Sequence, residues 1–492
     1  MLLKPSIVAT VATLLTIGTS LFIAGCSNEM DEIFANETPV VAEPTANQTL
    51  HSNYYWYKGK QIPLHVVDDK IFVLYDTAND LSDVPDIRRD QITNPIETRA
   101  DGSYVTSGIA WGIVAIDPST RGLGNTWTDH TPLPRKGKLT SKVVETDDGT
   151  ELAVSQIFYV KLKTQGSISK LNALCRAYNV NNLGQNKAMP LWYMLECTAE
   201  SYGNALEMAN LFYESGYFEA AEADLIDLEE EQTYLSAETN AEASPSNAAS
   251  YNDTYVSKQW NLNSIHALEA ASITKGSSDV IVAIVDQGIE LNHADLNVYG
   301  KSYNSETGRA GSVVYGNHAT AVAGIISGVA NNGIGIAGIA PESPVMSISN
   351  TLASTADSRQ KRANAIIYAI DNGASIINNS WSSSTQSALI DDAITAALTQ
   401  GRNGKGCIVI FSVGNDNSGT VNYPANSNPD ILAVGAMSTT PVRKTPSSPD
   451  GETNWGSNYG ASLDIMAPGL QIYTTDLSGR NGYSTTDYYA RF

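Results

Sequence analysis

The spacing of hydrophobic and polar residues changes along the chain and divides it into regions. Between 154 and 225, strand-like runs alternate with stretches of helical spacing, in which residues such as Ile168, Leu171 and Leu174 share one face. This order predicts a small β-α-β-α-β unit, with strands near 154–162, 190–197 and 218–225 and helices near 167–178 and 204–215. The unit holds no cluster of histidine, cysteine and acidic residues at site-like spacing, so we expect a structural or inhibitory role.

After residue 254 the pattern changes to short, continuous apolar runs between helical stretches. Examples are the predicted strands 280–285 and 407–413 and the predicted helix 388–398. Strands that are apolar throughout indicate a parallel sheet covered by helices on both faces. We therefore expect an α/β, doubly wound fold over 254–492, with ligands at the carboxyl ends of the strands.

The segments between these regions have different compositions. Residues 226–253 begin with an acidic run and continue with Ala, Ser, Glu and Asn, which is typical of a linker, and we expect a maturation site there. Residues 51–150 contain strand-like runs at 54–57 and 70–75 and form an N-terminal β-rich segment whose role the sequence leaves open. We therefore expect the α+β unit, 151–225, to be a domain of its own.

The N-terminus has the features of an export signal. Lys4 precedes an apolar stretch that ends in Ile23-Ala24-Gly25-Cys26. This ending resembles the lipobox of bacterial lipoproteins, which implies removal of 1–25, acylation of Cys26 and a tether over 26–50. A single membrane-spanning helix is the alternative, but Thr and Ser interrupt the run and no positive cluster follows it. We expect a lipoprotein of the cell envelope, at the outer membrane or cell surface.

Charge and cysteine content narrow the possible partners. The 52 acidic and 30 basic residues give a net charge of −22, which would repel a nucleic acid, so none is expected as a partner. Apart from Cys26, three cysteines remain, Cys175, Cys197 and Cys407, and an odd number supports no disulfide framework.

Two residues near strand and helix boundaries suggest catalytic chemistry. Asp286 closes the apolar run 280–285, and His318 directly precedes a helix-compatible run that starts at Ala319. A carboxylate buried at the end of a strand needs a partner, and a histidine beside it becomes a usable general base. Taken singly, Asp286 is better explained as a turn aspartate and His318 as a surface histidine.

The surrounding motifs resemble those of the subtilisin family of serine proteases. The resemblance covers roughly 254–492, about half the chain. Its motifs occur in the family's order: Asp286-Gln287-Gly288, His318-Ala319-Thr320, Asn378-Asn379-Ser380-Trp381, Ser412-Val413-Gly414-Asn415 and Met466-Ala467-Pro468-Gly469.

The resemblance implies a serine endopeptidase acting on polypeptides. Asp286 would orient His318, which would act as general base and then general acid, and Asn415 would donate its amide to the oxyanion. Ser380, Trp381 and Ser382 would line the groove in which the substrate lies as an added strand. For Trp381, a packed core tryptophan is the competing interpretation. The unit 151–225 would be the propeptide of this zymogen and its inhibitor, and we expect a monomer.

A structural calcium site is the other implication of the resemblance. The ligands would be the side chains of Asp253, Asp295 and Asn332 and the backbone carbonyls of Ile334 and Ile336. Hard oxygen ligands suit Ca²⁺, and a glycine-rich turn without an ion is the alternative. No organic cofactor is expected.

The chain departs from the family's pattern after Pro468. The family's Gly-Thr-Ser, which carries the nucleophile, does not occur in 469–492, and Ser484 lacks the preceding glycine. We expect the chain to be truncated before the catalytic serine and therefore inactive as given. The alternatives are a non-catalytic surface lipoprotein that binds peptides in the groove, and an adhesion protein that works through its N-terminal half.

Overall fold

The computed structural model describes residues 49–75, 88–91, 97–98, 104–105, 108–115, 137–228, 251–311 and 314–492. Cys26, the tether and most of the linker lie outside these residues. Among the helices described, none is both long enough and apolar enough to cross a membrane.

The N-terminal region, 49–228, is built on one eight-stranded sheet. Its strand order is β10-β11-β9-β8-β3-β7-β4, and β12, which lies off this path, pairs with β9 from Leu152 to Leu162. The strands are β3 (His65–Tyr75), β4 (Arg88–Gln91), β7 (Gly108–Ala115), β8 (Gly137–Glu145), β9 (Glu151–Leu162), β10 (Val180–Gln185), β11 (Trp192–Cys197) and β12 (Phe218–Asp227). Two short pairs accompany the sheet: β1 (Tyr54–Tyr57) with β2 (Lys60–Pro63), and β5 (Glu97–Thr98) with β6 (Tyr104–Val105).

This sheet runs across the domain boundary expected at 150/151. β8 and β9 pair antiparallel, with Val143 opposite Ala153, and a tight turn closed by the Gly149 N–H to the Thr146 carbonyl joins them. Because β3 pairs with β8 on its other side, the β-rich segment extends the sheet of the α+β unit. The two segments form one structural region.

Two helices pack on this sheet where the sequence predicts them. They are α1 (Ile168–Ala177) and α2 (Ala205–Glu214), and a 3-10 turn, Gln165–Ser167, precedes α1. At the start of α2, the Asn204 side chain accepts backbone N–H groups while the Glu207 side chain accepts the N–H of Asn204. This capping box satisfies backbone donors at the helix N-terminus, and it stabilises α2 where it packs against β9 and β12.

The C-terminal region, 251–492, contains the expected parallel sheet. Its order is β15-β14-β16-β13-β17-β18-β19-β20, parallel except at β15. The strands are β13 (Ile281–Asp286), β14 (Tyr303–Asn304), β15 (Arg309–Ala310), β16 (Val345–Ser349), β17 (Ala374–Asn379), β18 (Ile408–Ser412), β19 (Leu432–Met437) and β20 (Ile465–Pro468). A separate pair, β21 (Thr474–Thr475) with β22 (Tyr488–Tyr489), lies near the end of the chain.

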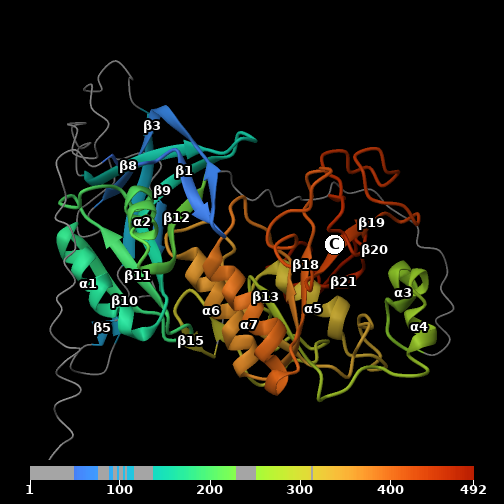
Figure 1. The fold of residues 1–492 in the computed structure, drawn as a ribbon. Helices are drawn as coiled ribbons and strands as arrows, with labels where there is room; N and C mark the ends of the chain where they lie inside the picture. Colours follow the sequence, from blue (N-terminus) through green and yellow to red (C-terminus); the bar gives the residue numbers. More distant parts are fainter. Residues whose placement is uncertain are drawn as a thin grey trace, which may run out of the picture. The chain divides into compact units, whose positions relative to one another are not determined.

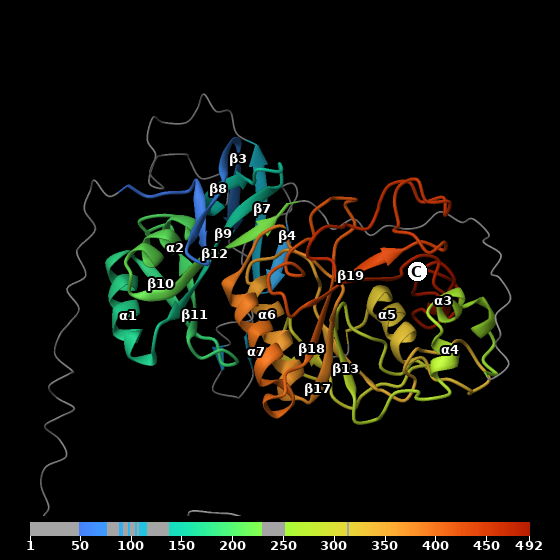
Figure 2. The ribbon, with the colours of Figure 1, turned by 45° about the vertical axis from the view of Figure 1, so that its right-hand side comes forward.

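Helices cover this sheet on both sides. The long ones are α5 (Asn317–Ser327), α6 (Ser358–Asp371) and α7 (Ala388–Gly404); shorter ones are α3 (Trp260–Ser264), α4 (Ala267–Ala270) and the 3-10 turn Val256–Lys258. Figures 1 and 2 show α6 and α7 together on one side of β13 and α5 on the other.

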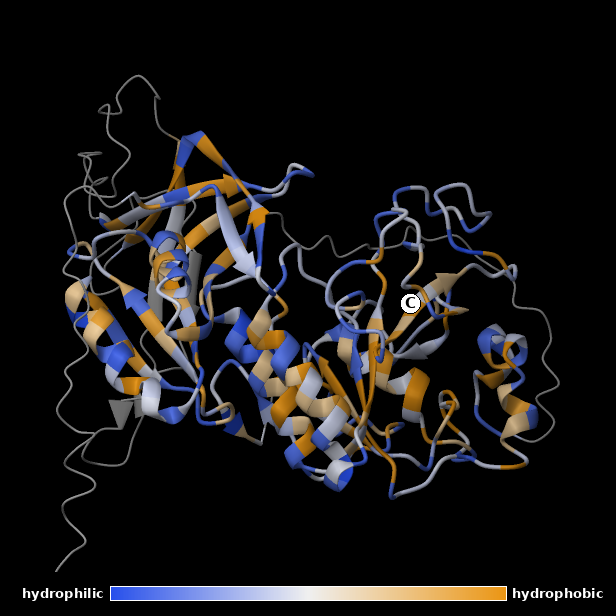
Figure 3. Ribbon diagram, viewed as in Figure 1, coloured by the Kyte–Doolittle hydropathy of each residue, from blue (hydrophilic) through white to orange (hydrophobic). Residues whose placement is uncertain are grey.

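Strand β13 has a hydrophobic core on each side because its side chains alternate. Val282 and Ile284 pack with Ala319 and Val322 of α5, whereas Ala283 and Val285 belong to the cluster that contains α6 and α7. Figure 3 shows the corresponding concentration of hydrophobic residues along the central strands. The doubly wound architecture follows directly from this arrangement.

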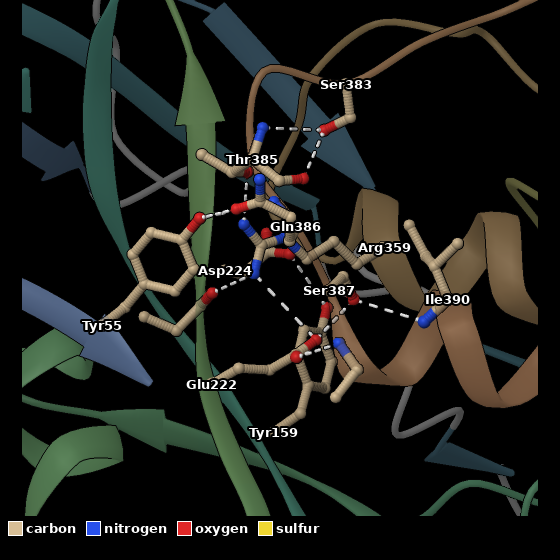
Figure 4. A network of polar contacts seen from close by, with 12 residues as sticks. Tyr55, Tyr159, Glu222, Asp224, Arg359, Ser383, Thr385, Gln386, Ser387 and Ile390 are labelled. Atoms are coloured by element: carbon tan, nitrogen blue, oxygen red, sulfur yellow. Dashed lines mark hydrogen bonds and ion pairs between the residues drawn. The ribbon is translucent and has the colours of Figure 1, made fainter. Parts of the chain in front are cut away.

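The two regions meet where β12 faces the N-termini of α6 and α7. The Glu222 carboxylate accepts the Ser387 hydroxyl and the Ala388 N–H, both at 2.6 Å, and the Asp224 carboxylate accepts the Asp357 N–H at 2.8 Å. Arg359 donates to the Ala223 carbonyl at 2.7 Å (Figure 4). These bonds satisfy donors at the starts of two helices, so β12 and its carboxylates form a polar docking edge.

Candidate active site

Asp286 and His318, predicted to act together, lie side by side at the carboxyl edge of the parallel sheet. Asp286 is the last residue of β13 and is fully buried, and His318 is in the first turn of α5. The imidazole Nδ1 lies 2.8 Å from Asp286 Oδ2, and the other carboxylate oxygen accepts the Gln287 N–H at 2.6 Å. The carboxylate thus fixes the ring through Nδ1, and a proton can be exchanged at Nε2.

Asn415 lies beyond the end of β18 and lines the same cleft as His318. Backbone bonds hold the loop that carries it: the Asn458 N–H donates to the Gly414 carbonyl at 2.9 Å, and the Gly456 N–H donates to the Asn415 carbonyl at 3.2 Å. Gly414 has φ of +98°, and a Cβ there would lie 2.4 Å from the Asn422 side chain. The close approach therefore requires glycine immediately before Asn415.

The Asn458 side chain supports this loop, and the sequence analysis did not identify it. Its Oδ1 accepts the N–H groups of Asp416 and Ser418, both at 2.9 Å, and its Nδ2 donates to the Val413 carbonyl at 3.1 Å. Asn458 is completely buried. Asn458 lies between Ser457 and Tyr459, where no hydrophobic periodicity indicates a buried position. The only local sign of its role is that it is an amide residue in a stretch rich in turns.

The cleft is large and its lining is mainly polar. Its volume is about 1680 Å³, and it brings together His318, Asn415, Ser380, Trp381 and Ser382. The three candidate groove residues directly follow β17, at the same carboxyl edge that carries Asp286. An elongated polypeptide is a suitable occupant of a cleft of this size and lining.

Trp381 belongs both to the core and to the cleft wall. Its side chain is almost fully buried, with its ring 5.0 Å from that of Phe411 in an edge-on arrangement. The Arg362 guanidinium lies 4.9 Å from the centre of the indole, and both residues line the cleft. Trp381 is therefore packed in the core and also lines the cleft, and its contact with a substrate stays a prediction.

The residues predicted to bind calcium surround the loop 331–336. Asp253 accepts the N–H groups of Asn331 and Asn332, and Asp295 accepts the Asn332 amide at 2.7 Å and the Ile336 N–H at 2.9 Å. Burial raises the pKa of Asp295, and the hydrogen bonds from Ile336 and Asn332 oppose this rise. In the part of the chain that the structure describes, no group of three or more His, Cys, Asp or Glu residues could hold a metal ion.

The oxygen donors of this loop nevertheless fit Ca²⁺ in type, because two carboxylates, one amide and backbone carbonyls are hard ligands. Gly335 has φ of +57°, and a Cβ there would lie 1.9 Å from Asp295 Oδ2. The loop thus wraps closely around the buried carboxylate.

The segment after β20 also contributes to the surroundings of the catalytic pair. The Phe492 ring lies 5.3 Å from the imidazole of His318, and both residues line the cleft. Burial, with the nearby Asp286 carboxylate as the next contribution, raises the pKa of Tyr483 to about 12. The Ser484 hydroxyl donates to the carbonyls of Thr486 and Tyr488. Ser484 is therefore placed as a turn residue.

The three cysteines that the structure describes contribute no site. Cys175, Cys197 and Cys407 are buried and form no disulfide. Burial raises the pKa of each thiol above its ordinary value, so each is a poor nucleophile. Cys26, the predicted lipidation site, lies outside the described residues.

Comparison with known proteins shows what the region around this site resembles. A family model described as the subtilase family matches residues 277–491. The chain is 34% identical over 230 residues to thermitase from Thermoactinomyces vulgaris, covering 46% of this chain and 75% of that protein. It is 32% identical over 234 residues to a thermophilic serine proteinase from Bacillus sp. (strain AK1), covering 47% of this chain. The chain spans 54% of that proteinase, about half its length.

A solved structure shares the fold. Fervidolysin from Fervidobacterium pennivorans, described as a keratinolytic enzyme related to subtilisin, superposes with a TM-score of 0.52 at 20% identity. The match covers 69% of this chain and 52% of that one, and it concerns the fold alone.

Proposed function

The chain belongs to the subtilase family of serine peptidases, and from this membership we propose that it is a subtilisin-type endopeptidase, exported as a lipid-anchored zymogen, that cleaves polypeptides. The observation that carries the proposal is the 2.8 Å contact between Asp286 and His318 on a cleft that also holds Asn415. The expected subtilisin-like fold is confirmed for the C-terminal region by the family match and the shared architecture.

The proposed mechanism follows from this geometry. His318 Nε2 takes the proton of a serine hydroxyl as its oxygen attacks the substrate carbonyl carbon, and Asp286 stabilises the imidazolium through Nδ1. Asn415 stabilises the negative charge on the former carbonyl oxygen. When the C–N bond breaks, His318 passes the proton to the leaving amine, which leaves an acyl-enzyme for water to hydrolyse.

The serine itself stays a prediction. Reading the coding sequence past codon 492 tests this prediction. An in-frame Gly-Thr-Ser soon after codon 492 would support the peptidase, whereas a stop codon would favour the non-catalytic peptide-binding lipoprotein.

A fluorophosphonate probe provides the chemical test. The complete gene product should be labelled, and its His318→Ala variant should be labelled far more slowly, because the histidine activates the serine. Equal labelling of the two proteins would contradict the assignment of His318 as general base.

We also propose that the N-terminal domain, 49–228, acts as the propeptide. The docking of Glu222 and Asp224 on α7 and α6 supports this role, and so does Asp227 at the end of β12, which lines the active-site cleft. The linker 226–253 would then leave the sheet beside the cleft, which would place the peptide bond cleaved during maturation within reach of the active site.

Export and anchoring remain proposals from the N-terminal sequence. Acylation of Cys26 would place the protein in the cell envelope, at the outer membrane or cell surface. Metabolic labelling with a radioactive fatty acid should mark the protein and should fail to mark Cys26→Ser. Labelling of both would exclude Cys26 as the site.

The loop 331–336 supports a proposed structural Ca²⁺. Asp253, Asp295 and Asn332 would bind it with their side chains, and Ile334 and Ile336 with their carbonyls. The ion would neutralise the buried carboxylates and rigidify the loop. No organic cofactor is proposed, and we propose that the protein acts as a monomer.

A further inference from the structure

Strand β1 has two faces that contact different parts of the molecule. On one face, the Tyr54 hydroxyl donates to Glu214 of α2 at 2.5 Å and the Trp56 indole N–H donates to the same oxygen at 3.0 Å. Tyr55 and Tyr57 point to the opposite side, because side chains alternate along a strand. The first face therefore fixes β1 to its own domain, and the second is available for another contact.

The second face contacts the peptidase domain at the start of α7. The Tyr57 hydroxyl donates to Asp391 Oδ2 at 2.6 Å, and the Lys58 ammonium lies 2.8 Å from the same oxygen. The Tyr55 hydroxyl donates to Gln386 Oε1 just before the helix. Figure 4 shows Tyr55 reaching from β1 toward Gln386, beside the β12 carboxylates.

The peptidase domain holds the Asp391 carboxylate in place for this contact. The Tyr423 hydroxyl donates to Asp391 Oδ1 at 3.1 Å and to the Ser387 carbonyl at 2.8 Å. Asp391 is buried, as is Tyr55, and the rings of Tyr57 and Tyr423 lie edge to face at 6.4 Å. A hydrogen bond to a buried carboxylate contributes more to binding than an exposed one, and loss of its donor leaves charge poorly solvated.

These contacts lie outside 151–225, the part of the N-terminal domain that the sequence alone predicts to be the propeptide. The hairpin β1–β2 precedes the α+β unit by about ninety residues, and its contacts are separate from those that Glu222 and Asp224 make. We propose that the hairpin β1–β2 is a second docking element, and that Tyr55 and Tyr57 set how tightly the N-terminal domain is held on α7. The proposal extends the propeptide role of that domain and depends on it.

The test measures affinity between the two parts of the full chain after they are disconnected. A recognition sequence for a sequence-specific protease is placed within 236–250, in a His318→Ala background that removes self-cleavage. After cutting, the dissociation constant of the two fragments is measured by fluorescence anisotropy on dilution. Tyr55→Phe with Tyr57→Phe should raise this constant at least about tenfold, the effect expected for loss of a hydrogen bond to a buried charged partner.

Tyr54→Phe is the matched control, since it removes a hydroxyl from the same strand on the face turned toward α2. Its dissociation constant should stay within about twofold of the parent, because the lost hydrogen bond to Glu214 lies within the N-terminal domain and not at the interface. A double variant that binds like the parent would overturn the proposal. An equal loss of affinity in Tyr54→Phe would also overturn it. So would parent fragments that dissociate as soon as they are cut.

A second measurement covers the case in which the double variant unfolds the N-terminal domain. In a double-mutant cycle, Tyr57→Phe should weaken binding less when Asp391→Asn is already present, because the two side chains share one hydrogen bond. Purely additive effects would contradict the assigned contact. None of these measurements needs peptidase activity, so failure of the docking element and failure of the proposed peptidase are distinguishable.

Discussion

The Asp224 carboxylate on β12 accepts the backbone N–H of Asp357 at 2.8 Å, so two acidic residues meet at the start of α6. Arg359 lies beside them and donates to the neighbouring Ala223 carbonyl, while Lys361 pairs with Asp357 at 2.9 Å. Tyr159 of β9 donates to the other Asp224 oxygen at 3.3 Å. The contact between the N-terminal and peptidase domains is therefore built around buried, closely spaced ionisable groups.

This arrangement predicts a pH dependence. Burial raises the pKa of Asp224 to about 7, with Arg359 opposing the rise and Asp357 adding to it. The pKa of Asp224 is therefore higher in the folded protein than in the unfolded one. As a result, the stabilisation from Asp224 is greatest at pH values below its ordinary pKa of 3.8 and is lost as the pH rises toward 7. The loss amounts to at most ~1.4 kcal/mol per pH unit for one proton.

Asp224→Asn removes the titrating group and nearly preserves its shape. The free energy of unfolding of the parent minus that of the variant should fall as pH rises from about 4 to 7 and stay constant above that range. Chemical denaturation at a series of pH values measures it. A difference that is independent of pH would show that Asp224 does not titrate in this range.

Asn458 should be essential for the stability of the loop that carries Asn415. Asn458→Ala would leave the N–H groups of Asp416 and Ser418 and the Val413 carbonyl without the partners they now have. Each buried group left unsatisfied costs about 1–3 kcal/mol, so we expect a loss of several kcal/mol in urea unfolding. Ser418→Ala removes only an exposed hydroxyl that caps Thr420, and it should stay within about 0.5 kcal/mol of the parent.

Removal of calcium should lower the melting temperature. A chelator in excess should reduce it by several degrees, and Asp295→Asn should be less stable and unresponsive to both chelator and added Ca²⁺, because it lacks a charged ligand. Differential scanning calorimetry with Mg²⁺ as the control ion measures this. A parent protein whose melting temperature ignores Ca²⁺ would favour a turn stabilised by hydrogen bonds alone.

Gly335→Ala should destabilise the same loop whether or not an ion is bound. The added Cβ would meet Asp295 Oδ2 and the Tyr488 ring, at a backbone conformation that favours glycine. Together, strain and overpacking typically cost about 1–3 kcal/mol. Gly333→Ala, at φ of +79° with no atom within 4 Å, isolates the backbone cost and should be the milder variant in thermal unfolding.

The sequence predicted that Asp286 and His318 lie together because each residue adjoins an element with a clear local pattern. Asp286 ends an apolar strand and His318 lies where a helical run begins, so the fold brings them together once the strands are parallel. The helices α1 and α2 were also predicted, because their apolar faces are regular.

Contacts between distant segments could not be predicted in this way. Strand β10 is mostly polar, and its pairing with β11 rather than its own pattern makes it a strand. The local pattern also did not predict that β8 pairs with β9. Nor did it predict the role of Asn458, whose hydrogen-bond partners are about forty residues away in the sequence. Local periodicity carries no information about which strand or loop supplies the complementary hydrogen bonds.

The alternation along β13 links the catalytic pair to the integrity of the whole C-terminal region. A single residue inserted before Asp286 would exchange the side chains that face α5 with those that face α6 and α7. It would also turn the carboxylate away from His318. A change in the length of β13 therefore disturbs both hydrophobic cores together with the acid, whereas a side-chain replacement can alter the acid alone.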